Sequence, residues 1–197
     1  MRNVIFDLGG VVFDWNPEAI IRAVFDDPTA QRLIKRQVFE HPDWSETDRG
    51  TLTRADAVER WAKRTGRPVA ELDALMRAAD LSMQPKRDTL RLLEELHSRG
   101  LHLYCLSNMP GERYAYLRRT YDFWDRFSGV VISAHVRMVK PEAGIFQHLL
   151  ATYDLEPAAT LFVDDAPRNI AAACALGIQG LLFTTAQACR EQLGDLF

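Results

Sequence analysis

Several residues that could carry out chemistry directly follow short apolar segments of this chain. The first is Asp7, which comes after the segment Val4-Ile5-Phe6 and before Leu8-Gly9-Gly10. A carboxylate at the end of a strand can attack phosphorus as a nucleophile, and a glycine turn lets backbone amides approach an anion closely. Taken alone, the same pattern also describes a turn aspartate or a helix-capping aspartate.

Polar and basic side chains follow two later apolar segments. Ser107 and Asn108 provide a hydroxyl and an amide that can donate hydrogen bonds to phosphate oxygens, or that can cap a helix instead. Lys140 stands directly before Pro141, a residue typical of the first position of a helix. Its ammonium would offset the charge of a phosphate and of nearby carboxylates, although a plain surface lysine is the alternative.

Two adjacent carboxylates, those of Asp164 and Asp165, follow the apolar segment Leu161-Phe162-Val163. Because they repel each other, bringing them near Asp7 costs free energy that a divalent cation would remove. Mg²⁺ favours one or two carboxylates together with phosphate oxygens and water. An exposed turn is the alternative for this pair. Together, the four segments supply a nucleophile, hydrogen-bond donors, a cation and metal ligands, which is the set that phosphoryl transfer needs.

These side chains need a common scaffold, and the apolar segments indicate which one. Each segment is continuously apolar, which is typical of strands buried on both faces of a parallel sheet. Helical patterns separate the segments. This alternation predicts an α/β fold with a doubly wound parallel sheet. The strands are expected at 3–6, 101–106, 130–133, 160–163 and 180–183, and the helices at 88–99, 145–153 and 171–176.

The region after the first strand has a different pattern, with helix-like runs and no strand-like segment. We therefore expect a small all-helical cap domain at 15–83, and a core domain formed by 1–14 and 84–197. A cap inserted there would lie above the carboxyl end of the first strand, where open α/β sheets bind ligands. The helical runs are at 20–25, 32–39, 55–64 and 69–79.

In the order and placement of these motifs, the chain resembles the haloacid dehalogenase-like (HAD) superfamily, in the subgroup that carries a helical cap after the first strand of a Rossmann-like core. The segment at 139–146, Val-Lys-Pro-Glu-Ala-Gly-Ile-Phe, is a specific match. Within this subgroup the chain is similar to small bacterial sugar-phosphate phosphatases of the α-D-glucose-1-phosphate phosphatase type. Those also begin with a motif of the form Asp-Leu-Gly, and the similarity spans nearly the whole chain.

The resemblance implies a magnesium-dependent phosphatase that hydrolyses a small phosphate monoester, such as a hexose 1-phosphate, through an aspartyl-phosphate on Asp7. It implies that Ser107, Asn108 and Lys140 hold the transferring phosphoryl group, and that Ser107 and Lys140 act with Asp7 in catalysis. The implied metal ligands are Asp7, the backbone carbonyl of Gly9, Asp164 and Asp165.

One position departs from the family pattern. Many phosphatases of the superfamily carry a second aspartate, a general acid and base, two positions after the nucleophile, and this chain has Gly9 there. General acid help is typically worth ~10²–10⁴ in rate, so we expect a slower enzyme or a substitute acid. Asp14 is a candidate substitute, although it also suits a turn at the boundary of the cap.

In similar proteins a short loop of the cap contacts the substrate, and the candidate loop here spans Trp44 to Thr53. Arg49 would lie at a flexible, cationic tip of this loop, and Trp44 could stack on a sugar face. The alternative is that Trp44 packs inside the cap, Arg49 is solvated and a helix starts near Thr53.

Composition limits the classes of partner and the compartment. The chain has 197 residues and a formal net charge of −3, without a basic block, so we expect no nucleic acid or membrane as a partner. We expect a monomer or dimer that binds a small phosphorylated molecule. The N-terminal apolar run is too short for a signal peptide or a membrane span. The three cysteines are far apart and predict buried, reduced thiols in a cytoplasmic protein.

Two other functions remain open at this point. A 2-haloacid dehalogenase of the same fold would use the aspartate to attack carbon and would need no metal, but the pair Asp164-Asp165 suits a cation better than an anionic substrate. A non-catalytic relative that binds a phosphorylated metabolite would explain Gly9. Magnesium-dependent turnover of a phosphate monoester separates all three functions.

Overall fold

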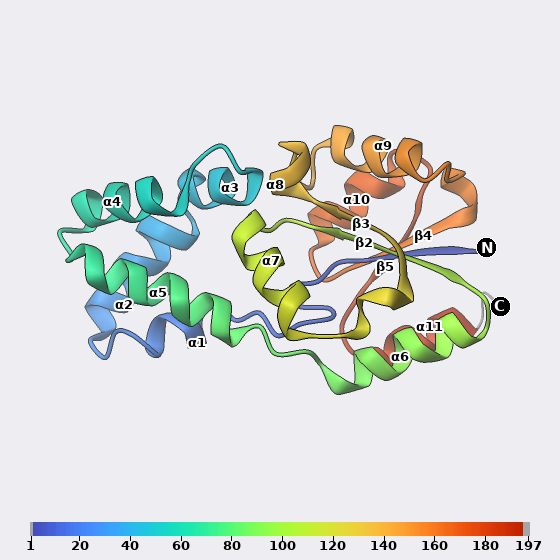
Figure 1. Ribbon diagram of the computed structural model, residues 1–197, viewed down its shortest axis with the longest axis horizontal. Helices are drawn as coiled ribbons and strands as arrows, with labels where there is room; N and C mark the ends of the chain where they lie inside the picture. Colours follow the sequence, from blue (N-terminus) through green and yellow to red (C-terminus); the bar gives the residue numbers. More distant parts are fainter. Residues whose placement is uncertain (1, 195–197) are drawn as a thin grey trace.

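The computed structural model describes residues 2–194 and contains one parallel sheet of five strands in the order β3-β2-β1-β4-β5. Each strand pairs with its neighbours in parallel register, with β1 at the centre (Figure 1). The strands are β1 Asn3–Phe6, β2 His102–Ser107, β3 Phe127–Ile132, β4 Thr160–Asp164 and β5 Gln179–Leu182. The predicted doubly wound α/β class is confirmed. The third strand begins three residues earlier than expected, because Ser128 and Gly129 interrupt its apolar pattern after Phe127.

Both faces of the sheet are buried, which explains why the strands are continuously apolar. Alternate strand residues divide between two hydrophobic clusters, with Val4 and Phe6 on one face and Ile5 on the other. The two layers of helices lie on opposite sides of the sheet in Figure 1. The first layer contains α6 Arg87–Ser98, α7 Gly111–Thr120, η2 Phe123–Arg126 and α11 Ala186–Gly194; the second contains α9 Ala143–Thr152 and α10 Pro167–Cys174.

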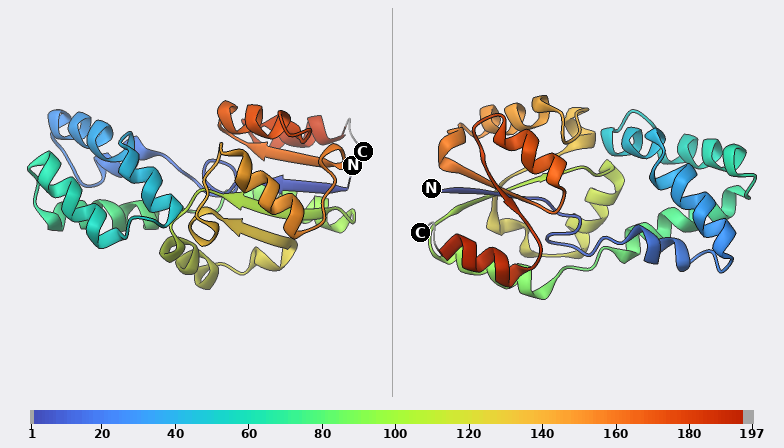
Figure 2. Two further views of the ribbon diagram at one scale, coloured as in Figure 1. Left: turned by 90° about the horizontal axis from the view of Figure 1, so that it is seen from above. Right: turned by 180° about the vertical axis from the view of Figure 1, so that it is seen from behind.

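The remaining helices of the N-terminal half pack on one another at one end of the sheet. They share a separate hydrophobic cluster centred on Trp61, Ile34 and Leu72. Figure 2 shows this helical layer beyond the ends toward which the strands point. We therefore propose that residues 15–83 form the cap. Its elements are α1 Pro17–Arg22, α2 Pro28–Ile34, the π-helix η1 Lys35–Phe39, α3 Pro42–Arg49, α4 Arg54–Thr65 and α5 Val69–Ser82.

The helix α3 corrects the prediction of a flexible loop at 44–53. The His41 side chain accepts a hydrogen bond from the amide of Asp43, Pro42 occupies the first turn, and Gly50 ends the helix with φ of 75°. A helix-capping side chain, a proline in the first turn and a glycine at the C-terminal end are ordinary signals for a helix. At the end of this segment Thr53 caps α4, which agrees with the alternative that a helix starts near Thr53.

Two short connectors complete the core. They are α8 Ser133–Val136, which follows β3, and η3 Pro157–Ala159, which precedes β4. The helix after Lys140 begins at Ala143 with Glu142 as its N-cap, and the Lys140–Pro141 peptide bond is cis. The prediction that Pro141 occupies the first helical position is therefore wrong, because the chain needs two more residues to enter the helix.

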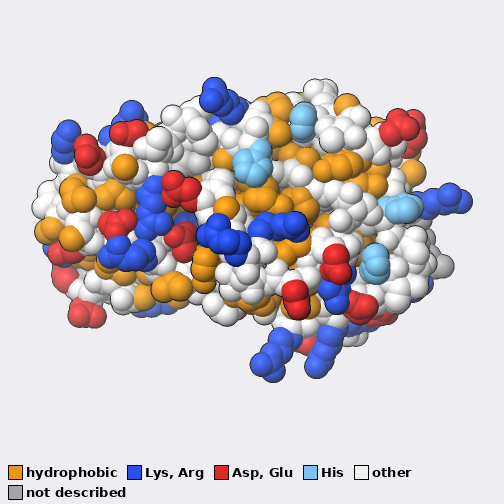
Figure 3. Space-filling view, viewed as in Figure 1, with side chains coloured by type: hydrophobic (Ala, Val, Ile, Leu, Met, Phe, Trp, Pro, Cys, Tyr) orange, Lys and Arg blue, Asp and Glu red, His pale blue; other side chains and the backbone are white. Residues whose placement is uncertain are grey.

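The surface and the cysteines add two observations. Acidic and basic side chains are interspersed over the face seen in Figure 3. None of the helices within residues 2–194 has both the length and the apolar character needed to cross a bilayer. Cys105 and Cys189 are buried and free, as predicted, whereas Cys174, the last residue of α10, is exposed.

Candidate active site

The predicted site residues meet at the carboxyl edge of the sheet. Asp7 follows β1, Ser107 is the last residue of β2, and Asp164 is the last residue of β4. Since β1 pairs with both β2 and β4, the ends of these three strands are adjacent. All three residues are buried, and the most exposed of them, Asp7, is 8% exposed. The fold therefore places a carboxylate, a hydroxyl and a second carboxylate side by side.

Lys140 connects two of these carboxylates. Its Nζ lies 2.8 Å from Asp7 Oδ1 and 2.7 Å from Asp164 Oδ2, and the side chain is buried. Burial opposes the charged form of the lysine, but the two carboxylates outweigh it and raise the pKa of Lys140. Lys140 is therefore a charged group inside the protein and not a surface lysine.

Asn108 holds the backbone at Lys140. Its Nδ2 donates to the carbonyl of Lys140 at 2.9 Å, and its Oδ1 accepts from the amide of Lys140 at 2.8 Å. Helix α7 begins at Gly111 without a side-chain cap, so Ser107 and Asn108 do not cap it. The Ser107 hydroxyl has no hydrogen bond within residues 2–194 and faces the cavity described below. Asn108 thus positions the lysine, and Ser107 is left with a hydroxyl that can bind an anion.

Asp164 is fixed by donors from the turn that follows it. The amide of Ala166 donates to Oδ1 at 2.8 Å, and Asn169 Nδ2 donates to both carboxylate oxygens at 3.0 Å. The Oδ1 of Asn169 is buried and has no partner among the described residues. These contacts hold the Asp164 carboxylate in one orientation next to Lys140 and Asp7.

Asp7, Asp164 and Asp165 form an acidic cluster whose ligand atoms all lie within 4.8 Å of one another. Burial is the main reason that the pKa of Asp7 rises to about 7, and the charges of Asp164 and Asp165 add to it against Lys140. Burial and the charge of Asp164 also raise the pKa of Asp165. Three carboxylates at this spacing fit a hard divalent cation such as Mg²⁺, which would offset their repulsion.

Gly10 makes room for this cluster. A Cβ at this position would lie 2.1 Å from Asp165 Oδ2, and φ is +79°, which disfavours other residues. The turn after β1 therefore needs glycine at position 10 so that Asp165 can approach Asp7. Gly9 lines the same cavity, where its backbone carbonyl was predicted to bind the metal.

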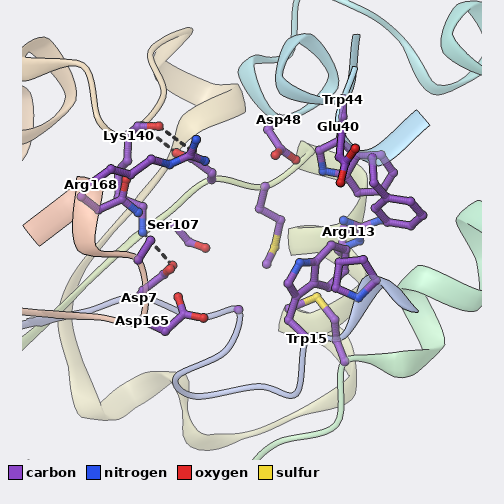
Figure 4. A pocket seen from close by; sticks show the side chains of 18 of the residues that line it. Asp7, Trp15, Glu40, Trp44, Asp48, Ser107, Arg113, Lys140, Asp165 and Arg168 are labelled. Atoms are coloured by element: carbon purple, nitrogen blue, oxygen red, sulfur yellow. Dashed lines mark hydrogen bonds and ion pairs between the residues drawn. The ribbon is translucent and has the colours of Figure 1, made fainter. Parts of the chain in front are cut away.

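A cavity of about 360 Å³ lies between the core cluster and the cap. Asp7, Ser107, Lys140 and Asp165 lie on its core side (Figure 4). The cap contributes the apolar residues Trp15, Phe39, Trp44 and Met83 together with the exposed charged residues Lys35 and Glu40, and Met109 of the core adds a further apolar side chain.

Trp44 and Arg49 were both predicted to contact the substrate, but only Trp44 lies at the cavity. Trp44 lines the cavity, but its ring also stacks on Phe39 at 4.4 Å and on Trp61 at 5.8 Å, measured between ring centroids. Arg49 does not line this cavity. Its guanidinium makes a two-pronged ion pair with Glu142 of the core, at 2.6 and 2.9 Å. The position of Arg49 therefore gives no support to the prediction that it contacts the substrate.

Arg113 and Asp48 are cavity residues that sequence reasoning missed. Arg113, on α7, is buried; its Nε donates to Asp80 of the cap at 2.7 Å, and its guanidinium lies over the rings of Trp15 and Trp44. Asp48, on α3, directs its carboxylate into the cavity from the cap. Neither has a local sequence signal, because cap packing alone brings them to the site.

Asp14, the predicted substitute acid, is exposed and does not line the cavity. Its amide donates to the carbonyl of Gln84, where the two chain segments between cap and core run together. Asp14 is therefore a boundary turn residue, which was the alternative given for it.

Fold and site together define an α/β enzyme with an aspartate, a lysine and an acidic pair beneath a helical cap. The chain belongs to the haloacid dehalogenase-like hydrolase family, whose model matches residues 1–177. The predicted family and the hydrolase class are confirmed.

Individual relatives agree with this assignment. The sesquiterpene phosphatase astK of Aspergillus oryzae is 31% identical over 195 residues, which cover 99% of this chain and 96% of that protein. A HAD family enzyme of Bacteroides thetaiotaomicron, solved with magnesium and inorganic phosphate, is 22% identical with a TM-score of 0.75 and coverage of 93% and 94%. The L-2-haloacid dehalogenase of Xanthobacter autotrophicus, solved with chloropropionic acid covalently bound, is 19% identical with a TM-score of 0.70 and coverage of 98% and 83%. At these identities the two structural likenesses concern the fold.

Proposed function

We propose that this protein is a magnesium-dependent phosphatase that hydrolyses phosphate monoesters of largely apolar alcohols through a phosphorylated Asp7. The observation that carries the proposal is the buried cluster in which Lys140 contacts Asp7 and Asp164, with Asp165 alongside. A dehalogenase has no need of three carboxylates at one point, whereas a phosphatase uses them to hold a metal. The similarity to a phosphatase over nearly the whole chain supports the same conclusion.

The residues of the cluster divide the work of phosphoryl transfer. Asp7 Oδ1 accepts hydrogen bonds from the amide of Leu8 and contacts Lys140, whereas Oδ2 has no hydrogen bond within residues 2–194 and is the attacking oxygen. The Ser107 hydroxyl donates to a phosphoryl oxygen, and Lys140 offsets the charge on the transferring group. Asp7, Gly9, Asp164 and Asp165 would hold Mg²⁺, which supplies further charge compensation at the phosphoryl oxygens.

The cap side of the cavity bears on the organic part of the substrate. Hydroxyl groups project from the edge of a sugar ring and need polar partners, yet three aromatic rings and Met83 form much of the cap side, beside charged side chains. Trp44 stacks on Phe39 and Trp61, so these contacts compete with its stacking on a sugar. An apolar body such as a terpenoid chain fits this lining better than the hexose 1-phosphate expected from the sequence. The name of the similar sesquiterpene phosphatase agrees with that preference.

A substrate panel tests the proposal. The purified protein would be assayed with farnesyl phosphate, α-D-glucose 1-phosphate, p-nitrophenyl phosphate and 2-chloropropionate, each with Mg²⁺ and with EDTA, and with an Asp7→Asn variant. We expect turnover of phosphate monoesters that requires both Mg²⁺ and Asp7, with kcat/KM highest for farnesyl phosphate. Metal-independent release of chloride would instead identify a dehalogenase, and a preference for glucose 1-phosphate would overturn the apolar substrate class.

A further inference from the structure

The phosphatase reaction needs a proton donor for the leaving oxygen, and Gly9 offers none. An in-line displacement places the leaving oxygen on the far side of phosphorus from Asp7. For a phosphoryl group held at Asp7, that side faces the cap. The donor should therefore be a cap residue that lines the cavity.

Two cap carboxylates line the cavity, those of Glu40 and Asp48. Glu40 is exposed at the end of η1. Asp48 is partly buried, and Figure 4 shows its carboxylate directed into the cavity from the cap. No hydrogen bond or ion pair engages the Asp48 carboxylate within residues 2–194. In contrast, the cap carboxylate of Asp43 is held by Arg64.

Core contacts fix the backbone on both sides of this carboxylate. The Ser133 hydroxyl of α8 donates to the backbone carbonyl of Asp48. The next residue, Arg49, makes its ion pair with Glu142. Gly50 then packs so closely on Ala134 that a Cβ would lie 2.8 Å from the Ala134 carbonyl oxygen. The end of α3 is thus docked on the core, and Asp48 is placed relative to the strand ends and not only to the cap.

The surroundings of Asp48 also suit a proton donor. Burial raises its pKa to about 7, while the positive charges of Arg113 on α7 and Lys140 act in the opposite direction. A carboxyl group that titrates near neutral pH can both give and take a proton there.

We propose that the Asp48 carboxyl group is the general acid that protonates the leaving oxygen, in place of the side chain that Gly9 lacks; this inference rests on the phosphatase function proposed above. In the first step an Asp7 oxygen bonds to phosphorus, the bond from phosphorus to the ester oxygen breaks, and that oxygen takes the Asp48 proton. In the second step water attacks phosphorus and gives a proton to the Asp48 carboxylate. The bond from phosphorus to Asp7 then breaks and releases phosphate, and the net reaction consumes one water per ester.

Substrates whose leaving groups differ in acidity distinguish a general acid from a residue with a purely structural role. In Asp48→Asn we expect kcat/KM, which reports steps up to release of the alcohol, to fall by about 10²–10⁴-fold for an alkyl phosphate. For p-nitrophenyl phosphate the fall should be less than about tenfold, since a good leaving group needs little protonation. The variant should also release one equivalent of nitrophenol rapidly and then turn over slowly, because water attack loses its base.

Two matched variants control the experiment. Glu46→Gln changes a carboxylate of the same helix that does not line the cavity, and it should leave both rates unchanged. Glu40→Gln tests the competing cap carboxylate. Thermal melts would establish that each variant is folded, and Asp48→Ser would replace an unfolded Asp48→Asn. A further measurement requires no variant: across a series of phenyl phosphates, kcat/KM of the wild type should vary little with the acidity of the leaving phenol.

The outcomes are distinct. The role of Asp48 would be overturned if Asp48→Asn lowered kcat/KM equally for both substrates or for neither. It would also be overturned if the loss that depends on the leaving group appeared in Glu40→Gln instead. In each case the phosphatase function would remain intact. A wild-type protein that binds Mg²⁺ but turns over no phosphate monoester would overturn the proposed function itself, and this inference with it.

Discussion

Replacing Lys140 with methionine would leave the carboxylates of Asp7 and Asp164 buried without the ammonium group that now contacts both at 2.8 and 2.7 Å. Methionine keeps an unbranched side chain, one atom shorter than lysine, and removes its charge. Breaking a buried ion pair by removing one partner typically costs about 3–5 kcal/mol, because the remaining charge is uncompensated. The Lys140 side chain is only 2% exposed, so solvent screens little of this cost.

That free energy converts into a measurable change in thermal stability. A loss of 1 kcal/mol lowers Tm by roughly 2–4 °C in a chain of this size, so Lys140→Met should melt roughly 6–20 °C below the wild type in EDTA. Added Mg²⁺ should raise the Tm of the variant more than that of the wild type, because the cation then replaces the missing positive charge. Differential scanning calorimetry with and without Mg²⁺ measures both effects.

Lys35→Met is the matched control. Lys35 makes an ion pair of the same 2.7 Å length with Glu18, but both side chains are about half exposed. Its removal should change Tm far less, since water and salt already screen this pair. A Lys140→Met variant that melts no lower than this control, or that gains no more from Mg²⁺ than the wild type, would refute the electrostatic account of the cluster.

Two further predictions concern the approach to the metal and the docking of the cap. Gly10→Ala should weaken Mg²⁺ binding about tenfold or more in calorimetric titration, because the new Cβ meets Asp165 and the αL backbone conformation costs roughly 1–2 kcal/mol for other residues. The control is Gly66→Ala, which also has positive φ but where a Cβ would meet no other atom within residues 2–194. This variant should lower stability and leave the Mg²⁺ affinity unchanged. Glu142→Gln should lower the free energy of unfolding at neutral pH by at most about 1 kcal/mol, since both partners are partly exposed. The hydrogen bond from Arg49 lowers the pKa of Glu142, so the ion pair stabilises the protein above the ordinary glutamate pKa and this stabilisation is lost as pH falls through the lowered value. In denaturant melts the free energies of unfolding of the wild type and the variant should therefore converge in acid. A difference that stays constant with pH would contradict this reasoning.

The core site could be predicted from sequence because its residues follow a local rule. Asp7, Ser107 and Asp164 each stand at the end of a continuously apolar segment, and parallel strands bring such ends to one edge. The positions of these residues after parallel strands were therefore enough to predict that residues as distant in sequence as Asp7 and Asp164 lie together. Lys140 followed from its place before a proline, although the helix begins later than that proline suggested.

The cap half of the cavity could not be predicted in the same way. Arg113 resembles a surface arginine on an amphipathic helix, but it is buried where it pairs with Asp80 and lies over the rings of Trp15 and Trp44. Asp48 precedes an Arg-Gly pair that suggested a mobile tip. Its direction depends on how α3 docks against α8, which is a contact between distant segments with no periodic signal. His41 and Gly50 cap the two ends of α3 in the structure, but such capping residues do not indicate which face of a helix meets the core.

The central claim is that Asp7 carries the phosphoryl group during turnover. The most direct measurement is rapid acid quenching of a single turnover with Mg²⁺ and a phosphate monoester, followed by mass spectrometry of proteolytic peptides. The account predicts one transient phosphoryl group on the N-terminal peptide at Asp7, absent with EDTA and absent in Asp7→Asn. A phosphoryl group on a different residue, or turnover by Asp7→Asn at the wild-type rate, would contradict it.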